Sequence, residues 1–118
     1  MPEVSIIIRT KNEERWIRHC LAMVYKQDFR DFEIILVDNQ STDHTVEVAL
    51  RNPLITVVKI DKYFPGHALN EGIRASKGRF IVCLSAHCIP KSTNWLSTLR
   101  RNFDEDKELA GVYGRQLP

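Results

Sequence analysis

The order of apolar and polar segments predicts strands that alternate with helices. Short, largely apolar runs of strand length, rich in Ile, Val, Leu and Phe, occupy residues 4–8, 32–37, 55–60, 80–84 and 109–113. Between these runs, apolar residues recur three or four positions apart, which is the spacing of one face of a helix. Alternating strands and helices form right-handed β-α-β units. The expected fold class is therefore α/β, with a mainly parallel sheet and flanking helices.

Polar residues precede the first two helical patterns and can cap them. Asn12, followed by two glutamates, suits the N-terminus of the first helix. The residues expected on its inward face are Trp16, Ile17, Cys20, Leu21 and Val24. Ser41 or Thr42 can cap the second helix, which Pro53 ends. The residues expected on its inward face are Val46, Ala49 and Leu50.

Glycines and small polar residues mark the two later helical patterns. Gly66 precedes the third pattern, and Gly78 is placed as the residue after its C-terminus. Ser92 or Thr93 can cap the fourth pattern. The apolar residues of the fourth pattern are Trp95, Leu96, Leu99 and Phe103.

The most informative segment is the run at residues 32–37, because it ends abruptly in Asp38 and a group of small polar residues. A continuous apolar run suits a parallel strand that is buried on both faces, and ligands of open α/β sheets collect where such strands end. A carboxylate at that position is desolvated unless another group bonds to it. Asp38 therefore either binds a ligand or accepts a hydrogen bond from the backbone of the next turn.

Polar clusters follow three of the expected strands and should meet at one edge of the sheet. The clusters are residues 9–12, 38–41 and 85–88. Convergent polar groups beside helix N-termini, whose N–H groups and dipoles favour phosphate, form a seat for a nucleotide. The sequence has no glycine-rich phosphate loop, so neither the Rossmann dinucleotide fingerprint nor the P-loop applies.

Simpler structural explanations compete at several positions. Asn12, Ser41 and Thr42 are also good helix caps. His87 is either a lone ligand for a divalent ion shared with a substrate's phosphates or a polar loop residue, since the spacing of a zinc site is missing. Cys83 lies inside an apolar run and is expected to be a small core residue.

Charge and composition argue against several classes of protein. The 17 Lys and Arg residues and 15 Asp and Glu residues are interspersed and give a net charge of +2, so nucleic acid is not an expected partner. Three cysteines without a C-x-x-C pair indicate reduced thiols rather than a disulfide framework. No apolar run approaches the ~20 residues of a transmembrane segment. Residues 1–118 are expected to form a single, cytoplasmic domain.

Four segments in order resemble family 2 glycosyltransferases of the GT-A fold, which transfer a sugar from a nucleotide-sugar donor. The segments are residues 5–13, 37–45, 66–78 and 84–90, and Trp95-Leu96 follows them. The resemblance implies a Rossmann-like nucleotide-sugar-binding half of this fold. It also implies that the chain is the donor-binding part of a longer protein, truncated at its C-terminus.

The resemblance assigns the donor site. In the family, the segment at residues 9–13 lines the nucleobase pocket, and the carboxylate at the position of Asp38 contacts the base or the ribose. Leu69 stands where the family often has an arginine near the donor phosphates, so that phosphate contact is either missing or supplied by His67 or Arg74. The implied donor-binding residues are Arg9, Thr10, Asn12, Glu13, Asp38, Asn39, Ser41, His67, Asn70, Arg74, Ser85, Ala86 and His87.

The metal-binding segment departs from the family pattern. Ser85-Ala86-His87 stands where the family usually has Asp-Ala-Asp, the DXD motif that holds Mg²⁺ or Mn²⁺ against the donor diphosphate. Manganese tolerates imidazole, and related polypeptide N-acetylgalactosaminyltransferases use an Asp-x-His version. The implied cofactor is a divalent ion, Mn²⁺ or Mg²⁺, held by His87 and mainly by the donor phosphates. Arg9, Lys11 and Gln40 replace a proline, a tyrosine and a glycine that are common in the family.

The resemblance places the catalytic base of an inverting transfer beyond Pro118, so no catalytic residue is assigned. The implied partners are a nucleotide-sugar donor and a glycan or lipid-linked acceptor, in polysaccharide or glycoconjugate synthesis at the inner face of the membrane. Truncation would expose apolar sheet surface, and we expect a homodimer to bury it. One alternative is a non-catalytic GT-A-like module for nucleotide or protein binding. A nucleotidyltransferase is disfavoured, since no basic, glycine-rich loop lies near Thr10.

Overall fold

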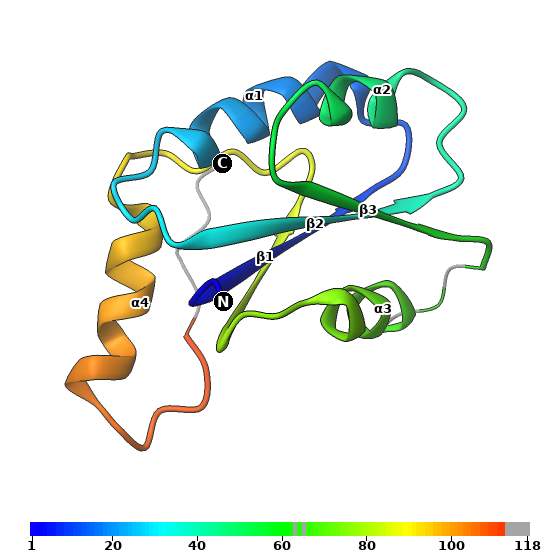
Figure 1. Cartoon of the computed structure of the whole chain (residues 1–118). Helices are drawn as coiled ribbons and strands as arrows, with labels where there is room; N and C mark the ends of the chain where they lie inside the picture. Colours follow the sequence, from blue (N-terminus) through cyan, green and yellow to red (C-terminus); the bar gives the residue numbers. More distant parts are fainter. Residues whose placement is uncertain (63, 65, 113–118) are drawn as a thin grey trace.

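Strands and helices alternate along the chain (Figure 1). The computed structural model describes residues 1–62, 64 and 66–112. The elements are β1 (Val4–Thr10), α1 (Glu14–Tyr25), β2 (Phe32–Asn39), α2 (Thr45–Leu50), β3 (Ile55–Ile60), α3 (His67–Ala75), β4 (Phe80–Ser85) and α4 (Trp95–Glu105). This order confirms the α/β class. Among these described elements, no helix combines the length and the apolar character needed to cross a bilayer.

The four strands of the described residues form one parallel sheet in the order β3-β2-β1-β4. From β1 the chain builds the sheet to one side with β2 and β3, and then to the other side with β4. Such a switch point leaves a crevice beyond the carboxyl ends of the strands, where ligands of open α/β sheets bind. The strand registers place Thr10 opposite Asp38, and Arg9 opposite Ser85, at this edge.

Helices cover both faces of the sheet, with α1 and α2 on one face and α3 on the other (Figure 1). Successive side chains of β1 point to opposite faces. Ile6 and Ile8 pack in the cluster that includes residues of α1 and α2, whereas Ile7 packs with Ala68 of α3. Coverage of both faces explains why the central strands are continuous apolar runs.

Two of the expected inward-facing residues are in fact exposed. Trp16 is 38% exposed and Leu50 is 57% exposed. On α1 the buried stripe consists of Ile17, Cys20, Leu21 and Val24, and Trp16 lies at its margin. On α2 the buried residues are Thr45, Val48 and Ala49. Thr45 lies on the inward face, where its hydroxyl accepts a hydrogen bond from the backbone N–H of Glu13, at the start of α1.

Cys83 is exposed rather than part of the core. It lies on β4, which is an edge strand of the described sheet. Cys83 is the register partner of Ile7, so it faces the α3 side of the sheet, but α3 packs against β1, β2 and β3. The apolar run of β4 therefore indicated a strand correctly but did not indicate its burial.

The expected fifth strand is not formed at residues 109–112, and Tyr113 lies outside the described residues. The backbone N–H of Leu109 instead donates to the carbonyl of Asp106 at 3.2 Å, which closes a turn after α4. The N-cap of α4 is Asn94, without a side-chain cap, so neither expected capping residue, Ser92 or Thr93, begins this helix.

Gly78 does not follow the C-terminus of α3 as expected, because α3 ends at Ala75 and its C-cap, Ser76, is extended. The reason for glycine is a close approach to β1. A Cβ at Gly78 would lie 2.5 Å from Ser5 Oγ and 2.6 Å from Ser5 N. The Gly78 N–H donates to Ser5 Oγ at 2.7 Å, and Ser5 Oγ donates to Glu33 at 2.6 Å. Gly78 thus lets the loop before β4 approach the backbone of β1.

Candidate functional site

The polar clusters at the ends of β1, β2 and β4 meet, as the sequence predicts. The Ala86 N–H donates to the carbonyl of Arg9 at 3.1 Å, and the Arg9 guanidinium donates to Ser85 Oγ at 3.0 Å. His87 Nδ1 lies 3.3 Å from a carboxylate oxygen of Glu13. The side chain of Ala86 is buried in the core, so only its backbone can face a ligand. The β4 end is therefore tied to the loop between β1 and α1.

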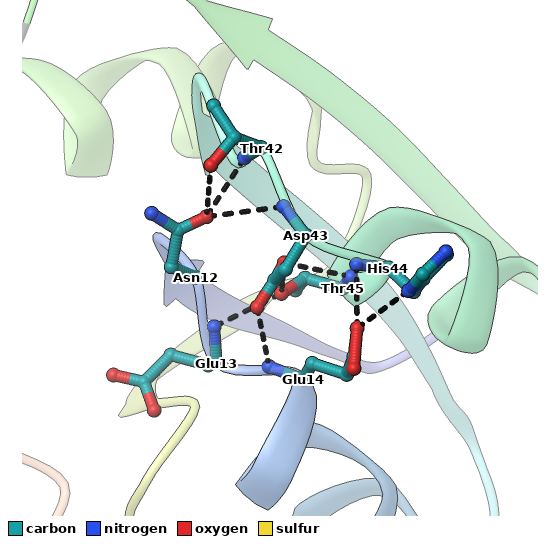
Figure 2. Close-up of polar contacts among 7 residues, drawn as sticks. All are labelled: Asn12, Glu13, Glu14, Thr42, Asp43, His44 and Thr45. Carbon is teal, nitrogen blue, oxygen red and sulfur yellow. Dashed lines mark hydrogen bonds and ion pairs between the residues drawn. The ribbon is translucent and has the colours of Figure 1, made fainter.

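Asn12 holds the loop between β2 and α2 rather than capping its own helix (Figure 2). Its Oδ1 accepts hydrogen bonds from the N–H groups of Thr42 and Asp43, at 2.7 and 3.3 Å. The N-cap of α1 is Glu13, which makes no side-chain cap. Asn12 itself has a φ of 51°, a left-handed conformation that asparagine tolerates better than most residues.

The loop between β2 and α2 caps α1 in return (Figure 2). The Glu14 N–H donates to Asp43 Oδ2 at 3.1 Å, and the Glu13 N–H donates to Thr45 Oγ1 at 2.9 Å. The carboxylate of Glu14 accepts from both the N–H and the ring of His44, at 2.7 and 2.8 Å. These N–H groups at the helix starts are thus hydrogen-bonded within the protein. They are therefore not available to bind a phosphate, as the sequence analysis expected of helix N-termini.

Two ionisable groups in this pair of loops are shifted by their contacts. Partial burial acts to raise the pKa of Asp43, but hydrogen bonds from Thr45 and from the Glu14 N–H outweigh it and lower that pKa. The hydrogen bond and negative charge of Glu14 raise the pKa of exposed His44. Asp43 is therefore a structural acceptor, and His44 joins α2 to α1.

Asp38 is buried, and its carboxylate is satisfied within the chain. Ser41 donates its N–H to one oxygen at 3.1 Å and its hydroxyl to the other at 2.5 Å. Of the two alternatives that the sequence offers for Asp38, a ligand or a hydrogen bond from the next turn, the structure shows the hydrogen bond. Each carboxylate oxygen can accept a further bond, so the arrangement orients Asp38 without using up its capacity for a ligand.

A cavity of about 690 Å³ opens beside Asp38. Its volume is in the range of small-molecule sites. Ser41 and Asp38 line it together with Lys59 and Asp61, which sequence reasoning missed. The available signal was the third strand end, because Lys59 is the register partner of Asp38 on β3.

Thr10 has an unused hydroxyl at the same edge. The residue is 5% exposed, and its Oγ1 has no hydrogen-bond partner among the described residues. A buried hydroxyl without a partner costs about 1–3 kcal/mol. Thr10 lies opposite Asp38 at the end of β1, so this unsatisfied hydroxyl is at the same strand ends as the Asp38 carboxylate.

The residues predicted on α3 are not all at the strand ends. His67 begins the helix and is half-buried, and Asn70 is exposed one turn later. Arg74 lies in the last turn, about 10 Å along the helix from His67, and pairs with Glu71. The structure therefore brings His67 closer to the strand ends than Arg74. Asn39, the remaining predicted residue, ends β2 and is half-buried.

The site contains few metal-binding side chains. Within the described part of the chain, no group of three or more His, Cys, Asp or Glu residues is arranged to hold a metal ion. His87 and Glu13 lie close together at the strand ends, with Nδ1 3.3 Å from a carboxylate oxygen.

Comparisons with known proteins agree with this architecture. The family model described as glycosyl transferase family 2 matches residues 5–116. The Methanococcus voltae protein named dolichyl N-acetyl-alpha-D-glucosaminyl phosphate 3-beta-D-2,3-diacetamido-2,3-dideoxy-beta-D-glucuronosyltransferase is 34% identical over 122 residues. That alignment covers 94% of this chain and 38% of the relative.

Solved structures share the fold. Staphylococcus aureus TarS, residues 1–349 in complex with UDP-GlcNAc, superposes with a TM-score of 0.80 at 28% identity, over 98% of this chain and 37% of that one. The mannosyltransferase PcManGT from Pyrobaculum calidifontis, in complex with GDP-Man and Mn²⁺, gives a TM-score of 0.81 at 29% identity, over 86% of this chain and 32% of that one.

The match extends over nearly the whole chain, and the chain spans less than two fifths of the length of these similar proteins. The fold expected from the resemblance, a parallel sheet with flanking helices of the GT-A type, is confirmed. The family match and the M. voltae relative agree with the four sequence segments. The chain belongs to glycosyl transferase family 2.

Proposed function

We propose that this chain is the donor-binding part of an inverting glycosyltransferase. The observation that carries the proposal is the meeting of Thr10, Asp38 and the β4 end at the switch point of the sheet, with a cavity of ligand size between Asp38 and the end of β3. The nucleotide-sugar complexes of TarS and PcManGT, two proteins of the same fold, support a nucleotide-sugar as the ligand.

Each group at the strand ends has a chemical role in this proposal. Asp38, oriented by Ser41, accepts a hydrogen bond from the base or the ribose. The hydroxyl of Thr10, which has no partner among residues 1–62, 64 and 66–112, adds a second contact. The Arg9 guanidinium, held on the β4 end by Ser85, offers positive charge to the diphosphate.

The acceptor in this proposal is a glycan or lipid-linked sugar, as polysaccharide synthesis requires. Transfer needs a base for the acceptor hydroxyl and stabilisation of the departing diphosphate. A divalent ion, when bound, supplies charge neutralisation at that leaving group. His87 is the proposed protein ligand for the ion, at the end of β4 where the donor phosphates approach. The described residues serve donor binding, and none is assigned as the base.

Isothermal titration calorimetry with UDP, GDP, dTDP and CMP, and with their sugars, tests the proposal. We expect saturable binding of at least one nucleotide. Asp38→Asn should weaken it about 10- to 100-fold, because a hydrogen bond to a charged group contributes about 1.5–3 kcal/mol. The matched control is Asp31→Asn, an exposed aspartate just before β2, at the opposite edge of the sheet. No binding across the panel by a folded sample would refute the proposal.

A further inference from the structure

The layer formed by α1 and α2 carries basic side chains that have no acidic partners. Figure 1 shows the two helices together on one face of the sheet, and they pack against each other. Four exposed residues of this layer form what we call the basic surface: Arg15, Arg18, Lys26 and Arg51. Within residues 1–62, 64 and 66–112, none of the four forms an ion pair. The layer therefore presents unpaired positive charge outward.

The acidic residues of the two helices do not neutralise this surface. They are Glu14 and Glu47. Arg18 follows Glu14 by four residues, a spacing that favours an ion pair. The Glu14 carboxylate instead bonds to His44, at 2.8 Å. Exposed Glu47 is thus the one acidic side chain of α1 and α2 that opposes the four basic residues.

The positive charges do not serve the stability of α1. Arg15 lies in the first turn of the helix, where the helix dipole favours acidic residues. Arg15 and Arg18 are three residues apart, a spacing at which like charges weaken a helix. The arrangement therefore indicates a negatively charged partner outside the chain.

Exposed apolar side chains lie at both ends of the basic surface. Trp16, in the first turn of α1, is partly exposed although the rest of the apolar stripe is buried. Leu50 and Leu54 are exposed at the end of α2 and in the turn that follows it. The Tyr25 hydroxyl donates to the carbonyl of Pro53, which places this turn beside the last turn of α1.

The backbone of Leu54 is unfavourable for leucine. Its φ is 64°, in the left-handed region that bulky residues rarely adopt. The side chain is 77% exposed, so no burial within the described structure compensates for this conformation. Residues held in this way collect at functional sites. A partner that receives the Leu54 side chain accounts for both observations.

An anionic lipid bilayer matches the charge and the apolar side chains together. Its surface attracts each nearby Lys or Arg strongly enough to tighten binding about fivefold. Tryptophan is enriched at the depth of the headgroups, where its ring is partly in apolar surroundings. The Arg15 guanidinium lies 4.9 Å from the centroid of the Trp16 ring, so the two reach the same depth. A soluble polyanion would use the basic surface but not Trp16 or Leu54.

We propose that the basic surface docks on a membrane that contains anionic lipids, with Trp16 and Leu54 inserted among the headgroups. The chain is adsorbed on the bilayer through one side of the α1–α2 layer. The residues that line the cavity beside Asp38 do not belong to the basic surface, so a docked chain keeps its donor site accessible. Docking therefore does not depend on the proposed function.

Co-sedimentation with unilamellar vesicles tests the proposal. We expect binding to mixed phosphatidylglycerol and phosphatidylcholine vesicles to be about tenfold or more tighter than to phosphatidylcholine alone, and to weaken in high salt. The double variant Arg15→Gln with Arg18→Gln should lose about 20-fold in vesicle affinity. The matched control, Arg101→Gln with Lys107→Gln, removes the same charge from the exposed end of α4 and should lose much less. Circular dichroism checks that each variant is folded.

Two further variants test insertion of the apolar side chains. Leu54→Gly should weaken vesicle binding several-fold without loss of stability in urea, because glycine adopts positive φ without strain. The chain has two tryptophans, Trp16 and Trp95. The natural chain should therefore show a blue shift of tryptophan fluorescence on vesicle binding, and Trp16→Phe should bind without it.

Three results would overturn the inference. Equal affinity for vesicles with and without phosphatidylglycerol would exclude recognition of anionic lipid. Equal losses for the two double variants would reduce the effect to net charge. Binding that ignores Leu54→Gly and shifts no fluorescence, while polyphosphate competes for the basic surface, would assign the surface to a soluble polyanion. Nucleotide binding in calorimetry should be the same in Arg15→Gln with Arg18→Gln, so the donor site and the membrane surface fail or succeed separately.

Discussion

Asn12→Ala is expected to destabilise the folded chain by about 2 kcal/mol. Asn12 Oδ1 is the shared acceptor for the N–H groups of Thr42 and Asp43. Loss of a capping acceptor of this kind costs about 1 kcal/mol. Asn12 also has a φ of 51°, and a left-handed backbone costs alanine about 1 kcal/mol or more.

Asn12→Gly separates the two contributions, because glycine adopts positive φ without strain. It should lose about 1 kcal/mol, mainly the acceptor, and so be more stable than Asn12→Ala. For a domain of this size, about 2 kcal/mol corresponds to a fall in Tm of about 8 °C. Urea denaturation and thermal melts followed by circular dichroism measure both effects.

Two results would refute this reasoning. Equal losses for the alanine and glycine variants would show that the left-handed backbone at position 12 does not penalise alanine. A loss below about 0.5 kcal/mol for Asn12→Ala would show that the mutual capping of α1 and α2 does not stabilise the chain, whatever hydrogen bonds it contains.

Other parts of the structure lead to three more expectations. Gly78→Ala should destabilise the chain by about 2 kcal/mol or more in urea denaturation, because the new Cβ would lie within 3 Å of β1 backbone atoms, whereas Gly111→Ala, in open space, should have little effect. Thr10→Val should leave stability unchanged or higher while lowering nucleotide affinity in calorimetry, since it removes an unpaired buried hydroxyl; reduced stability would contradict this. Glu14 raises the pKa of His44 above its ordinary 6.5, so charged His44 stabilises the fold below that pH, and this contribution is lost as pH rises through the raised pKa. The stability difference between the natural chain and His44→Asn should therefore be larger at pH 5.5 than at pH 8, and an equal difference would refute the shift.

The strands were the most predictable part of the fold. The four described strands lie where the apolar runs predicted them, because a run of β-branched residues between polar loops has few other ways to be buried. The burial of side chains was less predictable at the edge of the sheet. Cys83 is exposed on an edge strand, and its sequence context resembles that of the buried central strands.

The location of the candidate site could be predicted from the sequence, but most of its hydrogen bonds could not. Parallel pairing alone requires that Thr10, Asp38 and Ser85 lie at one edge. Asn12 accepts hydrogen bonds from backbone N–H groups, as the prediction of a helix cap requires. The prediction named the wrong groups, because these N–H groups belong to the loop before α2 rather than to α1. Local spacing cannot reveal a partner that lies about 30 residues away.

The alternation of strands and helices, the polar strand ends and the likeness to glycosyl transferase family 2 can be recognised from the amino-acid sequence, because each depends on spacing within a short segment. Which polar groups are already hydrogen-bonded, and which remain available, depends on the folded arrangement. Ser41 hydrogen-bonds to Asp38, the Thr10 hydroxyl has no partner within the described part of the chain, and Glu13 contacts His87. These contacts join segments far apart in the chain, so they exist only once the sheet has paired its strands in register.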